Sequence, residues 1–213
     1  GRSLVMLGEH ADKGGLSTHK SNILNIPFDM PSALLNKYTT QAFNHFYYKK
    51  QLECETSNTV HYDSFFYPLD SINNWNRIYG PNGFTQYQFV IPKESGKEGL
   101  KEILEAISNS KQGSFLSVLK VFGKGNKNHL SFPMEGYTLA LDFKFSDKLL
   151  NLLEHLDVIV KKYQGRLYLA KDVRMSEEMF KTSYPHWEEF QSLRKRLGID
   201  ELYQSLQSRR IGL

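Results

Sequence analysis

The sequence predicts an α+β fold built on a ferredoxin-like βαββαβ unit, in which a four-stranded antiparallel sheet carries two helices on one face. Two observations predict it. Strand-like segments, of which 84–91 and 137–145 alternate most regularly, lie at 84–91, 114–122, 137–145 and 166–170. Two segments with apolar residues at helical spacing follow the first strand and precede the last. Right-handed crossovers would place both helices on the same face of the sheet.

Residues 1 to about 80 are predicted to form an irregular N-terminal extension, because glycine and proline interrupt them repeatedly. Within this extension we expect one helix from Ser32, as its N-cap, to Tyr48. The aromatic-rich segment 60–67 alternates weakly between apolar and polar residues, which predicts a strand.

The two crossover helices and the C-terminal helices follow from spacing and capping residues. The first crossover helix has its apolar stripe at Leu100, Ile103, Leu104 and Ile107. The second begins after Ser146, a good N-cap, and ends at Gly165. Residues 176–213 are polar and are predicted to form C-terminal helices that Pro185 interrupts.

The alternation of the strands assigns residues to the two faces of the sheet. The side chains expected against the helices are Tyr87, Phe89, Ile91, Phe115, Leu119 and Val121. The opposite, open face would carry Gln86, Gln88, Val118, Lys120, Thr138, Ala140 and Asp142. A lysine within an apolar strand is costly to bury without a polar partner, which favours a binding floor. A sheet face that is simply half solvated is the alternative.

Composition and motifs exclude several function classes. Cys54 is the sole cysteine, so no intrachain disulfide or cysteine-based metal site can form, and the seven histidines show no metal-ligand spacing. No phosphate loop, dinucleotide fingerprint or nucleophile elbow is present. The net charge of +4 is mild, and the sequence shows no dense basic patch of the kind that nucleic-acid binders carry. No apolar run has transmembrane length.

The segment 165–172 is the most suggestive part of the chain for function. Tyr168 lies in the predicted last strand and Lys171 at its exit, where scaffolds often carry reacting groups. These two side chains share a face only if the strand breaks near Ala170. Glutamine side chains suit sugar hydroxyls, and lysines suit a phosphate or a developing negative charge. An ordinary surface lysine is the alternative for Lys171.

Several segments resemble the decaprenylphosphoryl-β-D-ribose oxidase family of vanillyl-alcohol-oxidase-type FAD enzymes. They are Trp75-Asn76-Arg77, the stretch 80–92, Ser131-Phe132-Pro133, the stretch 167–172 and Ser208-Arg209-Arg210. The resemblance implies that residues 1–165 form a substrate-binding domain. It also implies that residues 166–213 complete an FAD-binding domain whose N-terminal part is missing from this chain.

The same resemblance implies roles for individual residues. Tyr168 would contact the flavin and Lys171 would be the catalytic lysine beside flavin and substrate, while the substrate would be bound by Gln86, Gln88, Lys120 and Thr138. Thr138, Ala140 and Phe66 stand where the family has asparagine, cysteine and tyrosine, so the substrate can differ from the family's.

The resemblance therefore implies an FAD-dependent oxidoreductase acting on a sugar hydroxyl, with polyprenyl-phosphate-linked ribose as the substrate and a reductase as a partner. We expect FAD in the full-length enzyme and none bound to this chain alone. We expect no metal and no nucleic acid, and a cytoplasmic location with membrane association left open. An aldonolactone-type FAD oxidase is one alternative, and a non-catalytic ferredoxin-like binding module is another.

Overall fold

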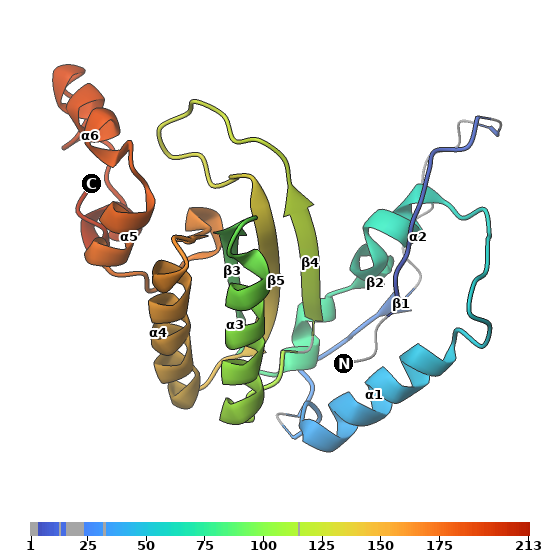
Figure 1. The fold of residues 1–213 in the computed structure, drawn as a ribbon. Helices are drawn as coiled ribbons and strands as arrows, with labels where there is room; N and C mark the ends of the chain where they lie inside the picture. The colour runs from blue at the N-terminus through green and yellow to red at the C-terminus, as the bar shows by residue number, and fades with distance from the viewer. Residues whose placement is uncertain (1–3, 13, 16–23, 32, 115) are drawn as a thin grey trace. The chain divides into compact units, whose positions relative to one another are not determined.

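The structure, a computed structural model, describes residues 4–12, 14–15, 24–31, 33–114 and 116–213 (Figure 1). The chain forms two compact units, Gly1–Gly83 and Phe84–Leu213, and each is described by itself. The domain division expected at residue 165 concerns a longer protein and stays a prediction.

The first unit is irregular, as expected. Its elements are β1 (Leu24–Asn25), α1 (Lys37–Lys49), α2 (Tyr62–Phe66), the 3₁₀ helix η1 (Pro68–Ser71), β2 (Ile72–Asn73) and the 3₁₀ helix η2 (Trp75–Tyr79). The two short strands pair in parallel. Arg77 joins η2 to the segment after β1, because its Nη1 donates to the carbonyl oxygens of Ile26 at 3.0 Å and Pro27 at 2.7 Å.

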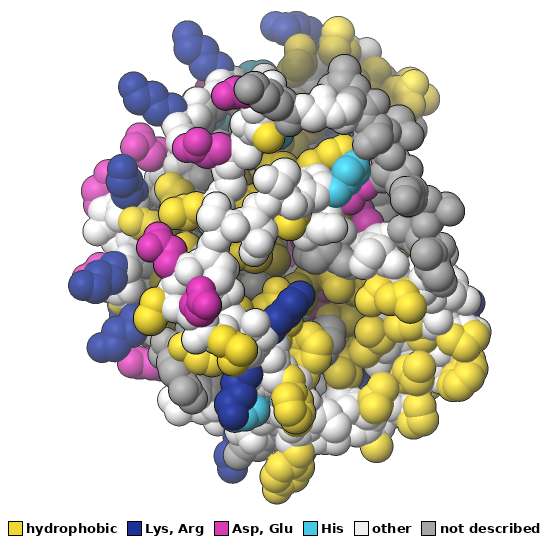
Figure 2. All heavy atoms as spheres, turned by 90° about the vertical axis from the view of Figure 1, so that its right-hand side faces the viewer, with side chains coloured by type: hydrophobic (Ala, Val, Ile, Leu, Met, Phe, Trp, Pro, Cys, Tyr) yellow, Lys and Arg dark blue, Asp and Glu magenta, His cyan; other side chains and the backbone are white. Residues whose placement is uncertain are grey.

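Helix α1 begins later than predicted. Its N-cap is Asn36, whose side chain accepts from the backbone N–H groups of Tyr38 and Thr39 in a capping box, and Ser32 lies outside the described residues. The helix exposes aromatic side chains, among them Tyr38 and Phe46. Figure 2 shows hydrophobic side chains gathered on the face of the molecule viewed there.

The strand predicted at 60–67 is wrong, because Tyr62–Phe66 forms the short helix α2. His61 is its N-cap, and its Nδ1 accepts from the backbone N–H of Asp63 at 3.4 Å. The alternation in this segment was weak, and a local cap of this kind favours a helical turn over an unpaired strand.

The second unit contains the predicted sheet. Its strands are β3 (Phe84–Pro92), β4 (Leu116–Phe122), β5 (Gly136–Lys144) and β6 (Arg166–Leu167). They run antiparallel in the order β4-β5-β3-β6, so the first and third strands of the unit lie at the centre of the sheet. This order confirms the antiparallel α+β fold of ferredoxin-like βαββαβ topology.

Helices α3 (Gly96–Ser110) and α4 (Asp147–Lys162) pack beside each other on one face of this sheet (Figure 1). The core lies between them and the sheet, and includes Phe89, Leu139, Ile103, Leu149, Leu153 and Leu156. Both faces of the sheet therefore follow the predicted alternation along β3 and β5.

Strand β4 departs from the predicted burial. The register puts Leu119 and Val121 on the helix side, opposite Leu139 and Tyr137, yet they are 58% and 65% exposed. They are exposed because β4 is the edge strand, beyond the cover of the two helices. Phe115, expected beside them, lies outside the described residues.

The chain after β6 packs against the same unit. It forms the 3₁₀ helix η3 (Leu169–Lys171) and helices α5 (Glu177–Ser183), α6 (Trp187–Arg196) and α7 (Leu206–Arg210). Met175, Phe180 and Tyr184 are buried, and the hydroxyl of Tyr184 donates to the carbonyl oxygen of Leu167 at 2.6 Å. In the described part of the chain, no helix is both long and apolar enough to cross a bilayer.

Three segments of the second unit meet in a partly buried polar cluster. The Oδ1 of Asp157 on α4 accepts from the hydroxyl of Tyr87 on β3 at 2.8 Å, and from Nη2 of Arg174 at 2.7 Å. Burial raises the pKa of Asp157 above its ordinary value, although the hydrogen bonds from Arg174 and Tyr87 oppose this. Burial also raises the pKa of Tyr87.

Replacement of Gly136 should destabilise the sheet. A Cβ at this first residue of β5 would lie 2.1 Å from the carbonyl oxygen of Ile91, and the paired backbone cannot withdraw. We expect Gly136→Ala to lower the free energy of unfolding by about 2–3 kcal/mol, measured by urea titration. Gly113→Ala is the matched control, because a Cβ there meets nothing within 4 Å. Equal urea midpoints for the two variants would contradict this packing.

The raised pKa of Asp157 predicts the sign of a pH effect. The folded chain holds this proton more tightly than the unfolded chain, so the stability that Asp157 contributes falls as pH rises from 3.8, its ordinary value, through the folded pKa. The unfolding free energy of the wild type minus that of Asp157→Asn should therefore decrease over this range.

Glu178→Gln is the control for that experiment. The hydrogen bond from Lys161 lowers the pKa of exposed Glu178, so its corresponding difference should increase with pH. Urea titrations from about pH 3 to 7 measure both differences, and a rising difference for Asp157 would refute the assignment.

Candidate functional site

The register of the sheet aligns the predicted binding residues on the open face. Gln88 on β3 lies opposite Ala140 on β5, which lies opposite Val118 on β4. Lys120 lies opposite Thr138 in the next row. Gln86 lies opposite Asp142, two residues along β3 from Gln88. All seven positions predicted for this face by alternation, Val118 among them, therefore share it.

The last strand ends early, and this brings two further candidates together. Strand β6 stops at Leu167, and Tyr168 continues in an extended conformation, with its N–H donating to the carbonyl oxygen of Gln88 at 2.9 Å. The 3₁₀ helix η3 follows at once, and the N–H of Lys171 donates to the carbonyl oxygen of Tyr168 at 3.0 Å. The break near Ala170 that a shared face requires is therefore present.

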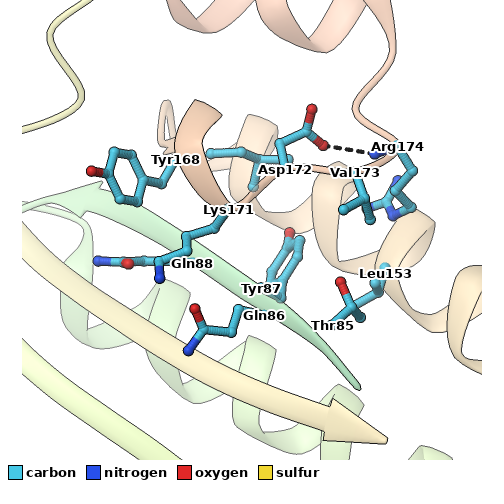
Figure 3. Close-up of a pocket in the computed structure, with 11 residues that line it drawn as sticks. Thr85, Gln86, Tyr87, Gln88, Leu153, Tyr168, Lys171, Asp172, Val173 and Arg174 are labelled. Carbon is cyan, nitrogen blue, oxygen red and sulfur yellow. Dashed lines mark hydrogen bonds between the residues drawn. The ribbon is translucent and has the colours of Figure 1, made fainter. Parts of the chain in front are cut away.

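Tyr168 and Lys171 line one pocket together with Gln86 and Gln88 (Figure 3). In Figure 3 the side chain of Lys171 extends from η3 toward Gln88 on β3. Among the described residues, the ammonium of Lys171 has no hydrogen-bond or ion-pair partner, and the residue is exposed. The enclosed space is about 10 Å³, roughly room for one water molecule, so these residues line a shallow surface pocket.

An aromatic contact covers one residue of this pocket, Tyr168. The ring of Phe132 stacks on the ring of Tyr168 with centroids 4.5 Å apart, and Phe122 meets Phe132 edge-on at 5.8 Å. Arg166 binds the loop between β4 and β5 that carries Phe132, because its Nη1 donates to the carbonyl oxygen of Ser131 at 2.7 Å. One side of the Tyr168 ring is therefore closed to solvent by the chain itself.

Lys120 and Thr138 share the face but do not line the pocket. Thr138 is only 1% exposed, and its hydroxyl accepts from Nε2 of Gln88 at 3.2 Å, so it orients the glutamine. Lys120 is exposed on the edge strand β4. Across the order β4-β5-β3-β6, three inter-strand steps of about 4.8 Å separate its strand from β6.

Sequence reasoning missed the residues that follow Lys171. Asp172, Val173 and Arg174 also line the pocket, and Asp172 Oδ1 accepts from the N–H of Arg174 at 2.9 Å, the dashed line in Figure 3. The polar run directly after a strand was the signal that could have found them. Within the described ranges, His, Cys, Asp and Glu form no group of three that could hold a metal ion.

Comparison with known proteins supports the resemblance. A family model for D-arabinono-1,4-lactone oxidase matches residues 81–205, which include the sheet, η3, α5 and α6. The chain is 36% identical over 210 residues to decaprenylphosphoryl-β-D-ribose oxidase from Mycolicibacterium smegmatis, covering 99% of this chain and 45% of that protein.

A more distant similarity points to a lactone enzyme. The chain is 21% identical over 130 residues to L-gulono-1,4-lactone dehydrogenase from Mycobacterium tuberculosis, covering 60% of this chain and 30% of that protein. The chain thus spans less than half the length of either relative. The family model covers more than half of the chain, and the chain belongs to the D-arabinono-1,4-lactone oxidase family.

Proposed function

We propose that this chain is the substrate-binding and C-terminal part of an FAD-dependent oxidoreductase that oxidises a sugar hydroxyl, with polyprenyl-phosphate-linked ribose as the substrate. The observation that carries the proposal is the single pocket wall formed by Gln86, Gln88, Tyr168 and Lys171. The identity to the ribose oxidase over 99% of the chain supports the choice of substrate. In the longer protein, residues 1–165 would form the substrate domain and residues 166–213 would complete the FAD domain.

The residues present could form one side of a flavin-binding site. Tyr168 offers a ring, and Lys171 offers an ammonium that no other described side chain neutralises. Bound FAD would supply the two-electron oxidation of the substrate C–H bond. The cavity of about 10 Å³ is far smaller than a flavin ring, so we expect this chain alone to hold no FAD.

The chain's own groups have distinct tasks in this proposal. Lys171 would stabilise negative charge or hold the reacting hydroxyl, because an ammonium donates strong hydrogen bonds to anionic oxygen. Gln86 and Gln88 would orient sugar hydroxyls, since an amide both donates and accepts. Thr138 would act by fixing the amide of Gln88. The contact of Phe132 with Tyr168 would exclude water from one side of the site.

Lys120 favours an extended, anionic substrate. It lies on the edge strand β4, two strand spacings or roughly 10 Å from β3 and three or roughly 14 Å from β6, so a ligand that touches both Lys171 and Lys120 must reach across the sheet. A ribose carrying a phosphate and a prenyl chain can do so. A small lactone would use the pocket alone.

Two other functions are less well supported. An aldonolactone-type FAD oxidase is favoured by the family match and by the distant lactone dehydrogenase. A non-catalytic RNA-binding module would need aromatic side chains on the open face of the central strands. That face carries Gln86, Gln88 and Val90 on β3, and Thr138 and Ala140 on β5.

The substrate can be tested by flavin bleaching. We expect the FAD-loaded full-length protein to lose its flavin absorbance under anaerobic conditions on addition of polyprenyl-phosphoribose. Aldonolactones should bleach it slowly or not at all. Bleaching by the lactones alone would reject our first choice and support the lactone oxidase.

The two lysines should affect different kinetic constants. In the full-length protein, Lys171→Ala should lower kcat by about 100-fold, the usual loss for one preorganised charge-stabilising donor. Lys120→Ala should chiefly raise KM for the phosphorylated substrate, by roughly 10-fold, because it would remove one charge-assisted contact. Lys97→Ala, on the helix side of the sheet, is the matched control and should leave both constants unchanged. An unchanged kcat in Lys171→Ala would remove this residue from the reaction.

A further inference from the structure

The C-terminal helix α7 returns to the turn that carries Lys171. Gln207, on α7, donates from Nε2 to the carbonyl oxygen of Leu169 at 2.7 Å and to Oδ2 of Asp172 at 3.3 Å. Arg210, one turn further along the helix, donates from Nη2 to the same Oδ2. Both ends of η3 are thus bound by a helix that lies more than 30 residues away in the sequence.

The carboxylate of Asp172 is fully engaged by these contacts. Its side chain is only 4% exposed. Oδ1 accepts from the backbone N–H groups of Arg174 at 2.9 Å and Met175 at 2.6 Å, while Oδ2 accepts from Gln207 and Arg210. A buried carboxylate needs such partners, and removal of one leaves an uncompensated charge.

Helix α7 is itself held in place at both ends, although it is only five residues long. Ser205 begins it with a capping box that includes Ser208. At the other end Ile211 is 2% exposed, and Gly212 has a φ of 73°. Gly212 lies against the side chain of Glu177 on α5, where an added Cβ would come within 2.5 Å of Oε1. Arg210 therefore reaches Asp172 from a defined position.

We propose that Arg210 and Asp172 are positioning residues for Lys171, and that α7 acts as a latch on the turn η3. The pairing has two consequences for Lys171. It fixes the short turn from which the lysine enters the pocket. It also occupies the carboxylate of Asp172, the next residue in the chain, so that this carboxylate is engaged by other donors and not by the lysine. The ammonium stays available to a ligand as a result. The kinetic part of this inference rests on the proposed function.

Arg194 provides the matched control for a merely structural role. It is also a buried arginine of the C-terminal segment, 6% exposed. Its Nη2 donates to the carbonyl oxygens of Asp200 at 3.0 Å and Tyr203 at 2.8 Å, so it holds the connection between α6 and α7. Among the described residues it makes no hydrogen bond or ion pair with η3. Loss of Arg194 should loosen that connection without releasing Asp172.

Hydrogen exchange of this chain tests the latch without any flavin or substrate. The N–H groups of Lys171 and Asp172 are bonded to Tyr168 and Leu169. In Arg210→Ala these two amides should exchange about 10-fold faster, whereas the amides of the β3–β5 ladder should not change. Arg210→Lys should restore part of the protection, because it keeps the charge. Arg194→Ala should accelerate exchange only between α6 and α7. Unchanged exchange at Lys171 in Arg210→Ala, or equal acceleration in Arg194→Ala, would overturn the latch.

Kinetics of the FAD-loaded full-length protein test the consequence for Lys171. Arg210→Ala should lower kcat by about 10-fold with little change in KM, and should add no further loss in a Lys171→Ala background, because it acts through that lysine. An equal loss in both backgrounds would overturn the positioning role, and so would normal kcat despite faster exchange. If no sugar substrate is oxidised at all, the proposed function fails, and the exchange experiment still decides the latch.

Discussion

The short pairing of β6 with β3 is the interaction on which the candidate site depends. Two residue pairs, Phe89 with Leu167 and Val90 with Arg166, form the whole ladder. The buried hydroxyl of Tyr184 then bonds the carbonyl oxygen of Leu167, so α5 holds the strand from its other side. A longer ladder would have carried Lys171 away along the edge of the sheet. Because it ends at Leu167, the chain turns and returns the lysine to the face of Gln88.

Two carboxylates with little solvent exposure fix the chain directly after that turn. Asp157 joins Arg174 to the sheet through Tyr87, and Asp172 joins α7 to η3. In each case an arginine compensates an anion that would be costly to bury alone. The result is a rigid run from Tyr168 to Met175 in which Lys171 is the cation left without a partner among the described residues. Rigid support around one uncommitted charge is what a preorganised site requires.

The candidate site lies at the surface of the second unit, and its residues are spread across the sheet. The pocket at β3 and η3 gathers Gln86, Gln88, Tyr168 and Lys171, whereas Lys120 lies on the far edge strand. This separation is the physical reason for preferring a long, anionic substrate over a lactone.

Much of the fold followed from local pattern, because alternation and helical spacing are properties of neighbouring residues. The βαββαβ order and the shared face of Gln86, Gln88, Lys120 and Thr138 were therefore predictable from the sequence alone. The segment 60–67 was mistaken for a strand, because no local signal revealed that it lacks a pairing partner. The exposure of Leu119 depends on strand order, which sets the edge of the sheet.

Tertiary structure alone decided how the site is completed. Where β6 ends depends on its pairing with β3, more than 70 residues earlier, and this decides whether Lys171 and Tyr168 can line one pocket. The contact of Arg210 with Asp172 joins positions 38 residues apart. No periodicity reports such a contact, because it arises only when α5, α7 and the turn pack together. The sequence by itself determined which groups face the open side of the sheet, and the packing of the C-terminal segment decided which of them meet.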